Sequence, residues 1–225
     1  MGDLLRHVLP LALGAAISPA VLTVSVLLLS APRRPVARAT LFLLGTTVVL
    51  VVLSVIGFTV LHQAVQDKPS ATKDAISGSI DATIALVLYA LALRTVVRAR
   101  VGSTDEQAET APQHHQGDGL GTAFLLGVVV MTTNITTILL YLPAMKDIAT
   151  SSVSDTDKTI VFVLALLITS IPALVPLLLR IVAPGPSIRV LSRINESLTR
   201  HRRTVAIAVE LIFGTYLLIK GLGQL

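Results

Sequence analysis

The sequence predicts an all-α polytopic membrane protein with six transmembrane helices. Of its 225 residues, 53% are hydrophobic and only 14% are charged, whereas an average soluble domain has about 25% charged residues. Its mean hydropathy is +0.80. Apolar stretches repeatedly reach the roughly 20 residues that a helix needs to cross about 30 Å of hydrocarbon. The spans fall into two groups of three, an arrangement typical of two inverted three-helix repeats.

We place the six spans at about residues 4–30, 37–61, 75–97, 120–142, 159–182 and 204–222. The first apolar run continues past the length of a signal peptide, so we interpret it as a retained span. We expect one membrane domain, built from a first repeat (1–98), a flexible cytoplasmic loop (99–119) and a second repeat (120–225). The loop is rich in Gly, Gln, Pro and acidic residues, a composition typical of disorder.

The positive charges predict the orientation of the spans. The connections after spans one, three and five carry twelve arginines, whereas the opposite side carries six Lys or Arg residues. Positive residues accumulate on the cytoplasmic side, so both termini are predicted outside. The isoelectric point near 10.0 then reflects these arginines rather than a nucleic-acid partner. The chain has no cysteine, which excludes disulfides and thiol redox chemistry.

An amphipathic helix is expected at about residues 186–200, between spans five and six. Its apolar residues recur at spacings of three and four, which places them on one face: Ile188, Leu191, Ile194 and Leu198. This pattern indicates an interfacial helix on the inner leaflet. The nearby arginines have two interpretations. They either anchor the loops, or they attract a phosphate-bearing lipid headgroup, and the candidates for the second role are Arg33, Arg34, Arg193, Arg202 and Arg203.

A Ser-Pro pair interrupts the first span near its middle. Pro19 cannot donate a backbone hydrogen bond, so the carbonyl of Ala15, four residues earlier, loses its helical donor. Ser18 places a hydroxyl beside that carbonyl, and Gly14 leaves room for another backbone or a substrate. We therefore expect a kinked or broken helix here.

A polar patch lies at a similar depth in the fourth span, which runs in the opposite direction. Asn134 stands among threonines that include Thr133 and Thr137. Polar groups in hydrocarbon need partners or water, so the two interruptions together predict a midplane substrate site made by Gly14, Ser18, Pro19, Thr133, Asn134 and Thr137. The alternative is that prolines and small residues only help the helices to pack. Pro172 and Pro176 also predict a kink in span five.

Two carboxyl groups lie inside predicted spans, Asp81 in the third and Glu210 in the sixth. A charged group in hydrocarbon is costly and usually faces a cavity or a partner. One or both are therefore candidates for proton coupling or cation binding. The alternatives are hydration near the surface for Asp81 and a hydrogen bond to a neighbouring helix for Glu210.

The chain resembles the GAP/Sap proteins of actinobacterial cell envelopes, the peptidoglycolipid- and sulfolipid-addressing proteins of the LysE transporter superfamily. The opening PLALGAAISPAVLTVSVLLLSAPRRPVARATLFLLGT and the ending FGTYLLIKGL carry this resemblance. It implies a LysE-like fold of two inverted three-helix repeats in a bacterial plasma membrane, and a role in moving envelope lipids or glycolipids outward. The superfamily often has Asn-Pro in span four, whereas here Ile135 follows Asn134, so the second break is expected to be softer.

Three functions remain open. The first is a transporter or flippase for an envelope lipid, glycolipid or lipid-linked glycan, coupled to protons through Asp81 or Glu210. The second is an exporter of an amino acid or cation on the same scaffold. The third is a non-transporting scaffold that binds envelope-biosynthesis proteins. We find no nucleotide-binding loop, nucleophile–base–acid set or metal triad, so we expect neither an enzyme nor a cofactor. Small residues on span one would permit a homodimer.

Overall fold

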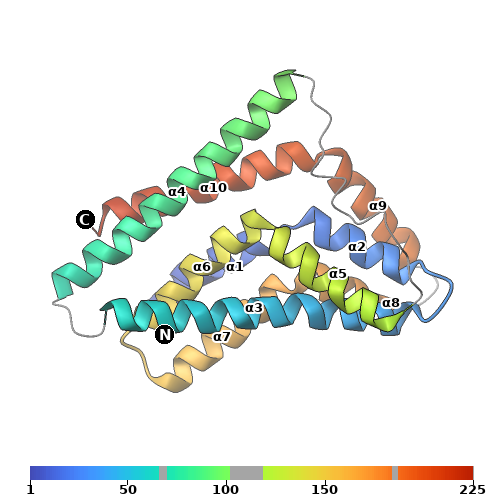
Figure 1. Ribbon diagram of the computed structural model, residues 1–225, viewed down its shortest axis with the longest axis horizontal. Helices are drawn as coiled ribbons and strands as arrows, with labels where there is room; N and C mark the ends of the chain where they lie inside the picture. The colour runs from blue at the N-terminus through green and yellow to red at the C-terminus, as the bar shows by residue number, and fades with distance from the viewer. Residues whose placement is uncertain (66–69, 102–118, 184–186, 225) are drawn as a thin grey trace.

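The structure is a computed structural model that describes residues 1–65, 70–101, 119–183 and 187–224 (Figure 1). Within these ranges the chain forms ten α-helices and no strand: α1 (Gly2–Ala16), α2 (Pro19–Leu29), α3 (Pro35–Val65), α4 (Ser70–Val101), α5 (Leu120–Thr133), α6 (Ile135–Thr150), α7 (Asp155–Thr169), α8 (Ile171–Val182), α9 (Ser187–Arg200) and α10 (Arg202–Leu222). Most of the predicted loop at 99–119 lies outside the described residues.

The described helices provide three to six candidate membrane spans. Three unbroken segments are long and apolar enough to cross a bilayer: 35–59 of α3, 72–97 of α4 and the whole of α10. Three further candidates are bent pairs, α1–α2 with a 54° bend, α5–α6 with a 76° bend and α7–α8 with a 70° bend. The protein is therefore a multi-pass membrane protein, and the predicted breaks in spans one and four are confirmed.

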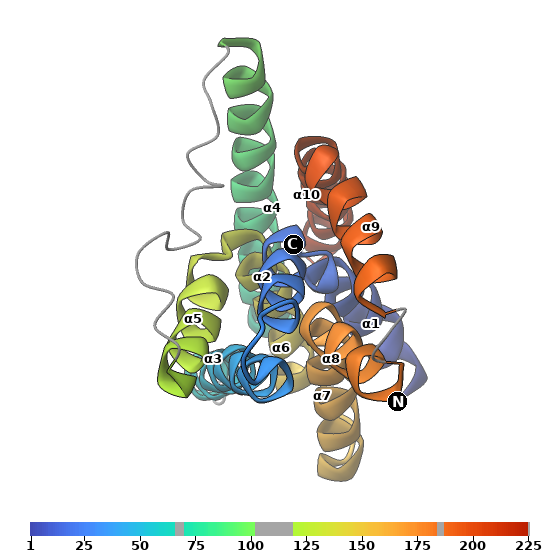
Figure 2. The ribbon, with the colours of Figure 1, turned by 90° about the vertical axis from the view of Figure 1, so that its right-hand side faces the viewer.

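The helices form three layers (Figures 1 and 2). α4 and α10 pack against each other along one side of the molecule. The broken pairs α1–α2 and α5–α6 lie in the middle, with α1 packed on α6. α3 and α7–α8 lie on the opposite side, where α3 contacts both α5 and α6. The middle layer thus brings the two predicted breaks together.

The molecule has two ends. The terminal end carries both termini, the end of α3 and the start of α7, and the arginine end carries α9 and the turn between α2 and α3 (Figure 1). The largest apolar cluster extends from the terminal end to the middle, where Val8, Leu140, Tyr141, Ile148 and Leu217 are fully buried. Two smaller clusters fill the arginine end. Packing is therefore most continuous toward the terminal end.

The contact between α3 and α5 depends on two glycines. A Cβ on Gly45 would overlap the backbone carbonyl of Phe124, and a Cβ on Gly127 would overlap that of Phe42. Small residues let membrane helices approach this closely. This crossing holds α5 closely against α3.

The amphipathic helix predicted at about 186–200 corresponds to α9. Leu191 is buried and Leu198 packs in the same cluster with α2 and α8, while Thr23 on α2 donates a 2.8 Å hydrogen bond to Asn195. Val190 and Ile194 remain about half exposed. Part of the apolar face therefore packs on the protein, and only the rest is free to meet lipid.

Candidate functional site

The break between α1 and α2 follows from Ser18 and Pro19. Pro19 is the first residue of α2, and Ser18 is its N-cap, accepting a hydrogen bond from the backbone N–H of Val21 at 3.3 Å. Such a cap satisfies one of the donors that a helix start leaves free. Ser18 has extended backbone angles (φ −126°, ψ 94°), so the helix cannot continue through it. The Ser-Pro pair both ends one helix and begins the next.

The break between α5 and α6 forms without a proline. Asn134 ends α5 and caps α6, because its side-chain oxygen accepts a hydrogen bond from the backbone N–H of Thr137 at 3.4 Å. Asparagine is among the best capping residues. The sequence predicted a softer break here, yet the 76° bend is the largest of the three. A cap alone is enough to turn this helix.

The two breaks bond directly to each other. Asn134 Nδ2 donates to Ser18 Oγ at 2.6 Å, and the Thr137 hydroxyl donates to the Ala15 carbonyl at 3.1 Å. This is the carbonyl that Pro19 deprives of its helical donor. The pairs 18–134 and 15–137 step in opposite directions along the chain, as two antiparallel helices require. We call Ala15, Ser18, Asn134 and Thr137 the break contact.

The third break lies beside the break contact. Ser170 separates α7 from α8, and Pro172 is the second residue of α8, in agreement with the kink predicted from the prolines. The Thr169 hydroxyl is buried without a hydrogen-bond partner among the described residues. A hollow of about 10 Å³ separates Thr169 and Ser170 from Ser18 and Thr137. It has room for about one water molecule with several polar partners.

α10 covers the other side of the break contact. Glu210 is buried, and one of its carboxyl oxygens accepts a 3.4 Å hydrogen bond from the hydroxyl of Thr136, two residues after Asn134. Its other oxygen is buried without a partner among the described residues. One turn further, Phe213 packs on Gly14 so closely that a Cβ there would lie 2.5 Å from the ring. A carboxyl group thus stands directly beside the two breaks.

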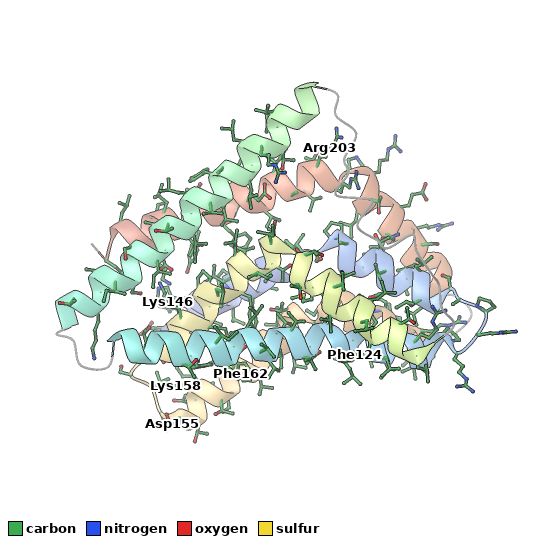
Figure 3. All side chains as sticks on the ribbon, in the orientation of Figure 1. Phe124, Lys146, Asp155, Lys158, Phe162 and Arg203 are labelled. Carbon is green, nitrogen blue, oxygen red and sulfur yellow. The ribbon has the colours of Figure 1, made fainter. Side chains whose placement is uncertain are left out.

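Not every predicted site residue joins this arrangement. Thr133 is exposed, and its hydroxyl bonds back to the carbonyl of Val129 at 2.9 Å within α5. Arg33 and Arg34 lie in the turn before α3, where Arg34 adopts a left-handed conformation (φ 48°). Arg193 lies on α9, and Arg202 and Arg203 begin α10 (Figure 3). The arginines are therefore set apart from the break contact.

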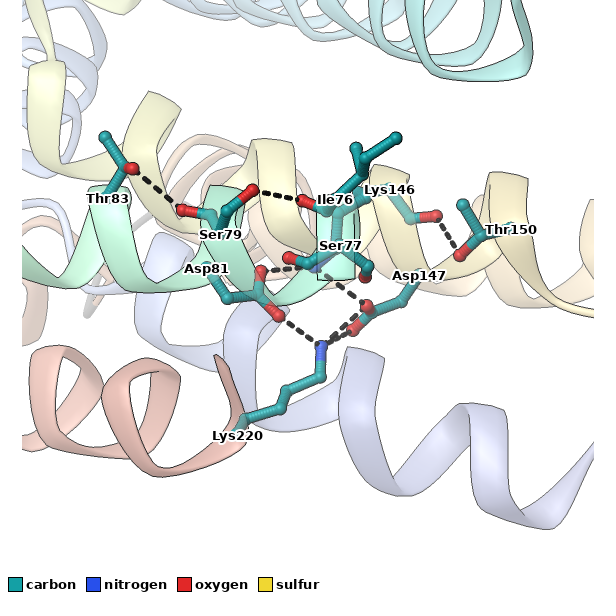
Figure 4. Close-up of polar contacts among 9 residues, drawn as sticks. All are labelled: Ile76, Ser77, Ser79, Asp81, Thr83, Lys146, Asp147, Thr150 and Lys220. Carbon is teal, nitrogen blue, oxygen red and sulfur yellow. Dashed lines mark hydrogen bonds and ion pairs between the residues drawn. The ribbon is translucent and has the colours of Figure 1, made fainter. Parts of the chain in front are cut away.

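Asp81 belongs to a second cluster, near the terminal end (Figure 4). It is fully buried between two lysines, forming ion pairs with Lys146 of α6 and, at 3.2 Å, with Lys220 of α10. Lys220 also contacts both oxygens of Asp147 at 2.6 Å. Lys146 donates a further 3.0 Å bond to the carbonyl of Ser77. We call Asp81, Lys146, Asp147 and Lys220 the ion quartet.

The ion quartet ties α4, α6 and α10 together. Its four formal charges sum to zero, and the side chains of Asp81 and Lys146 are at most 1% exposed. Beside it, α4 and α10 cross at Gly78 and Gly221, where a Cβ on either glycine would lie 2.6–2.7 Å from the carbonyl oxygen of the other. Removing one member of a buried ion pair leaves an uncompensated charge. Losing any member of the quartet would therefore weaken the packing of α4, α6 and α10 at the terminal end.

The hydropathy pattern did not predict that three members of the quartet, Lys146, Asp147 and Lys220, would take part in a buried cluster. Span four was expected to end near residue 142, which would leave Lys146 and Asp147 in a connection. Lys146 and Lys220 are two of the six positive residues counted on the side opposite the arginine-rich connections. In the structure α6 continues to Thr150, because each charge finds an opposite charge on a neighbouring helix. Charges of both signs near the same end of three spans were the signal in the sequence. Both predicted carboxylates, Asp81 and Glu210, are indeed buried.

A side groove opens between α3 and α7 at the terminal end. Its volume is about 530 Å³, and its described lining comprises Phe58, Thr59, Ala149, Asp155, Lys158, Thr159 and Phe162. Phe58 and Phe162 meet edge to face with their ring centroids 6.3 Å apart. No three His, Asp or Glu side chains gather anywhere in the described ranges in a way that could hold a metal ion.

Comparison with known proteins gives one family. The family described as Sap, sulfolipid-1-addressing protein, matches residues 8–223, nearly the whole chain. No curated protein and no solved structure matches. The match includes every member of the break contact and of the ion quartet.

Proposed function

Because this chain belongs to the Sap, sulfolipid-1-addressing protein family, we propose that it is a secondary transporter or flippase that exports a cell-envelope lipid, glycolipid or lipid-linked glycan. The family name points to a membrane lipid. The proposal adds a transport mechanism to that role, and it treats the chain as a transporter rather than an enzyme or a passive scaffold.

The observation that carries the proposal is the break contact. Two antiparallel helices lose their regular hydrogen bonding at the middle of their length, and each completes its hydrogen bonds on the other. Transporters built from inverted repeats place their sites at such discontinuous helices. Two neutral hydrogen bonds, each worth roughly 0.5–1.5 kcal/mol net, can be exchanged for bonds to a passing polar headgroup. A passive scaffold would have no need of interrupted helices in its core.

The cavities favour a lipid over a small solute. The hollow at the break contact, about 10 Å³, is too small for an amino acid. The side groove is about 50 times larger and lies between two candidate spans. A lipid needs such a lateral opening, whereas a polar solute needs an enclosed chamber. We therefore place the amino-acid or cation exporter second.

Glu210 is our choice for the proton-coupling residue. Its carboxyl group is buried, touches Thr136 beside the break contact, and has one oxygen without a partner in the described chain. A carboxyl group with a single weak partner can gain or lose a proton without dismantling other contacts. Asp81, by contrast, is held by two ammonium groups. We therefore assign Asp81 to closing the terminal end rather than to carrying protons.

Two inverted three-helix repeats fit the packing. The first helix of one predicted repeat packs on that of the other, α1 on α6, and the last helices pack likewise, α4 on α10. In the proposed orientation the terminal end faces outward and the arginine end faces the cytoplasm of a bacterial cell. Arg33, Arg34, Arg193, Arg202 and Arg203 would then attract anionic headgroups of the inner leaflet. A homodimer and contacts with envelope-biosynthesis proteins remain part of the proposal.

The test is a lipid profile of the cell surface in a deletion strain. The strain is complemented with the wild-type protein, with Ser18→Ala/Asn134→Ala, or with a vector, and membrane levels of each protein are matched by immunoblot. Export predicts that one lipid class disappears from the surface and accumulates inside, and that only the wild type restores it fully. An unchanged profile in the deletion strain would contradict lipid export.

A further inference from the structure

We propose that the side groove is an exit-side binding site for an anionic amphiphile, with Lys158 as the residue that recognises its headgroup. This inference rests on the proposed function and deepens it, because it gives the exported lipid a second binding site with a defined headgroup preference. The break contact is not part of the groove.

The lining of the groove has an apolar part and a polar part. Phe58 and Phe162 supply an aromatic surface, while Thr59, Asp155, Lys158 and Thr159 add hydroxyl and charged groups. Figure 3 shows Asp155, Lys158 and Phe162 in succession along the first half of α7. An aromatic surface beside charged groups matches a molecule with an acyl chain and a polar head.

The level of the groove matches the membrane surface. Asp155 is the first residue of α7, and the first turn of this helix is polar because it carries Asp155, Asp157 and Lys158. The polar rim therefore lies where the hydrocarbon ends, while the residues below it, Val55 on α3 and Val163 on α7, are exposed and apolar. An amphiphile in the groove would place its head at the rim and its chain along these residues.

Among the described lining residues, Lys158 is the one positive group that could bind an anion, and Asp155 is the one negative group. Lys158 is half-buried and, within the described chain, its ammonium group has no ion-pair partner. Asp155 lies one turn earlier on the same helix but forms no ion pair with it. A sulfate or phosphate monoester on a sugar would bring its anion to Lys158 through charge-assisted hydrogen bonds. Asp155 and the two threonines would then accept or donate to sugar hydroxyls.

Binding can be measured directly because the chain contains no tryptophan. Phe162→Trp places a single fluorophore in the groove of the purified full-length protein in nanodiscs. The probe is a sulfated alkyl glucoside with a dibrominated chain, compared with the unsulfated parent. We expect saturable quenching by the sulfated probe and a dissociation constant about tenfold higher when Lys158→Gln is added, the effect of roughly one charge-assisted bond. Lys73→Gln, which removes a charge near the same end, should leave the constant unchanged.

Equal quenching with and without Lys158, or no quenching at all, would overturn the proposal. If the Phe162→Trp protein is not monodisperse, quenching can be measured instead with a tryptophan on α3, in Phe58→Trp. The surface lipid profile of Lys158→Gln separates the two proposals. Normal export without Lys158-dependent binding would refute the groove and leave the transport function standing. Lys158-dependent binding in a protein whose deletion leaves the lipid profile unchanged would refute the transport function alone.

Discussion

The break contact and the ion quartet both involve α6, where Asn134 and Lys146 lie about 18 Å apart along the helix axis. The first is made of neutral groups and the second of charged groups. The break contact joins neutral groups through two hydrogen bonds beside a water-sized hollow. The quartet joins four charges with almost no exposure. Neutral bonds to freed backbone groups can be exchanged at little cost, whereas buried charges are costly to separate. From this difference we propose that the break contact opens during export, whereas the ion quartet keeps the terminal end closed.

The largest effect is expected from breaking the ion quartet. Asp81→Ala leaves Lys146 without its closest partner in the core, and it should lower the free energy of unfolding by about 3–5 kcal/mol. Thermal unfolding of the detergent-purified protein measures the loss. The double variant Asp81→Leu/Lys146→Met, which removes a matched pair, should recover most of it. If Asp81→Ala unfolds at the wild-type temperature, the quartet does not hold the terminal end.

The glycine crossing beside the quartet should be the next most sensitive position. Gly221→Ala places a methyl group against the backbone of α4, and overpacking of this kind costs about 1–3 kcal/mol. Gly121→Ala is the matched control, because nothing lies within 4 Å of the Cβ it would add. We expect only Gly221→Ala to lower the unfolding temperature. Equal behaviour of the two variants would mean that α4 and α10 can separate freely.

Glu210→Gln should reduce export without changing the stability of the protein. The change keeps the shape and removes a buried carboxyl group with one weak partner, so we expect a wild-type unfolding temperature. Export should fall at least tenfold and lose its response to an imposed proton gradient, measured by the rate at which labelled lipid reaches the surface. Glu196→Gln, on the exposed face of α9, is the control. Proton-sensitive export by Glu210→Gln would exclude Glu210 as the coupling group.

Variants of the break contact should lose less stability than variants of the ion quartet or of the glycine crossing beside it. Ser18→Ala and Asn134→Ala each remove a cap and one shared hydrogen bond, which should cost about 1 kcal/mol each. Because the two side chains bond to each other, the double variant should cost less than the sum, by about 0.5–1.5 kcal/mol. Unfolding temperatures of the four proteins give this coupling. Strict additivity would show that the 2.6 Å bond contributes nothing.

The sequence indicated the break contact better than the ion quartet, for a physical reason. A proline removes a donor from a known carbonyl, so Pro19 identified Ala15 as the group in need of a partner. It could not say that Thr137 would supply the donor, nor that Thr133 would bond within its own helix. The quartet depends on helices that are far apart in sequence, so no local pattern shows that Lys146 and Lys220 meet Asp81. Side-chain pairing across helices allowed α6 to extend beyond its apolar segment.

The central claim is that the break contact must open during export. The chain has no cysteine, so Ser18→Cys/Asn134→Cys can be joined by a short, reducible methanethiosulfonate cross-linker, with the two single-cysteine variants treated in parallel. We predict that cross-linking stops lipid export in the double variant alone and that a reductant restores it. Export that continues at the same rate with the two breaks covalently joined would contradict the account.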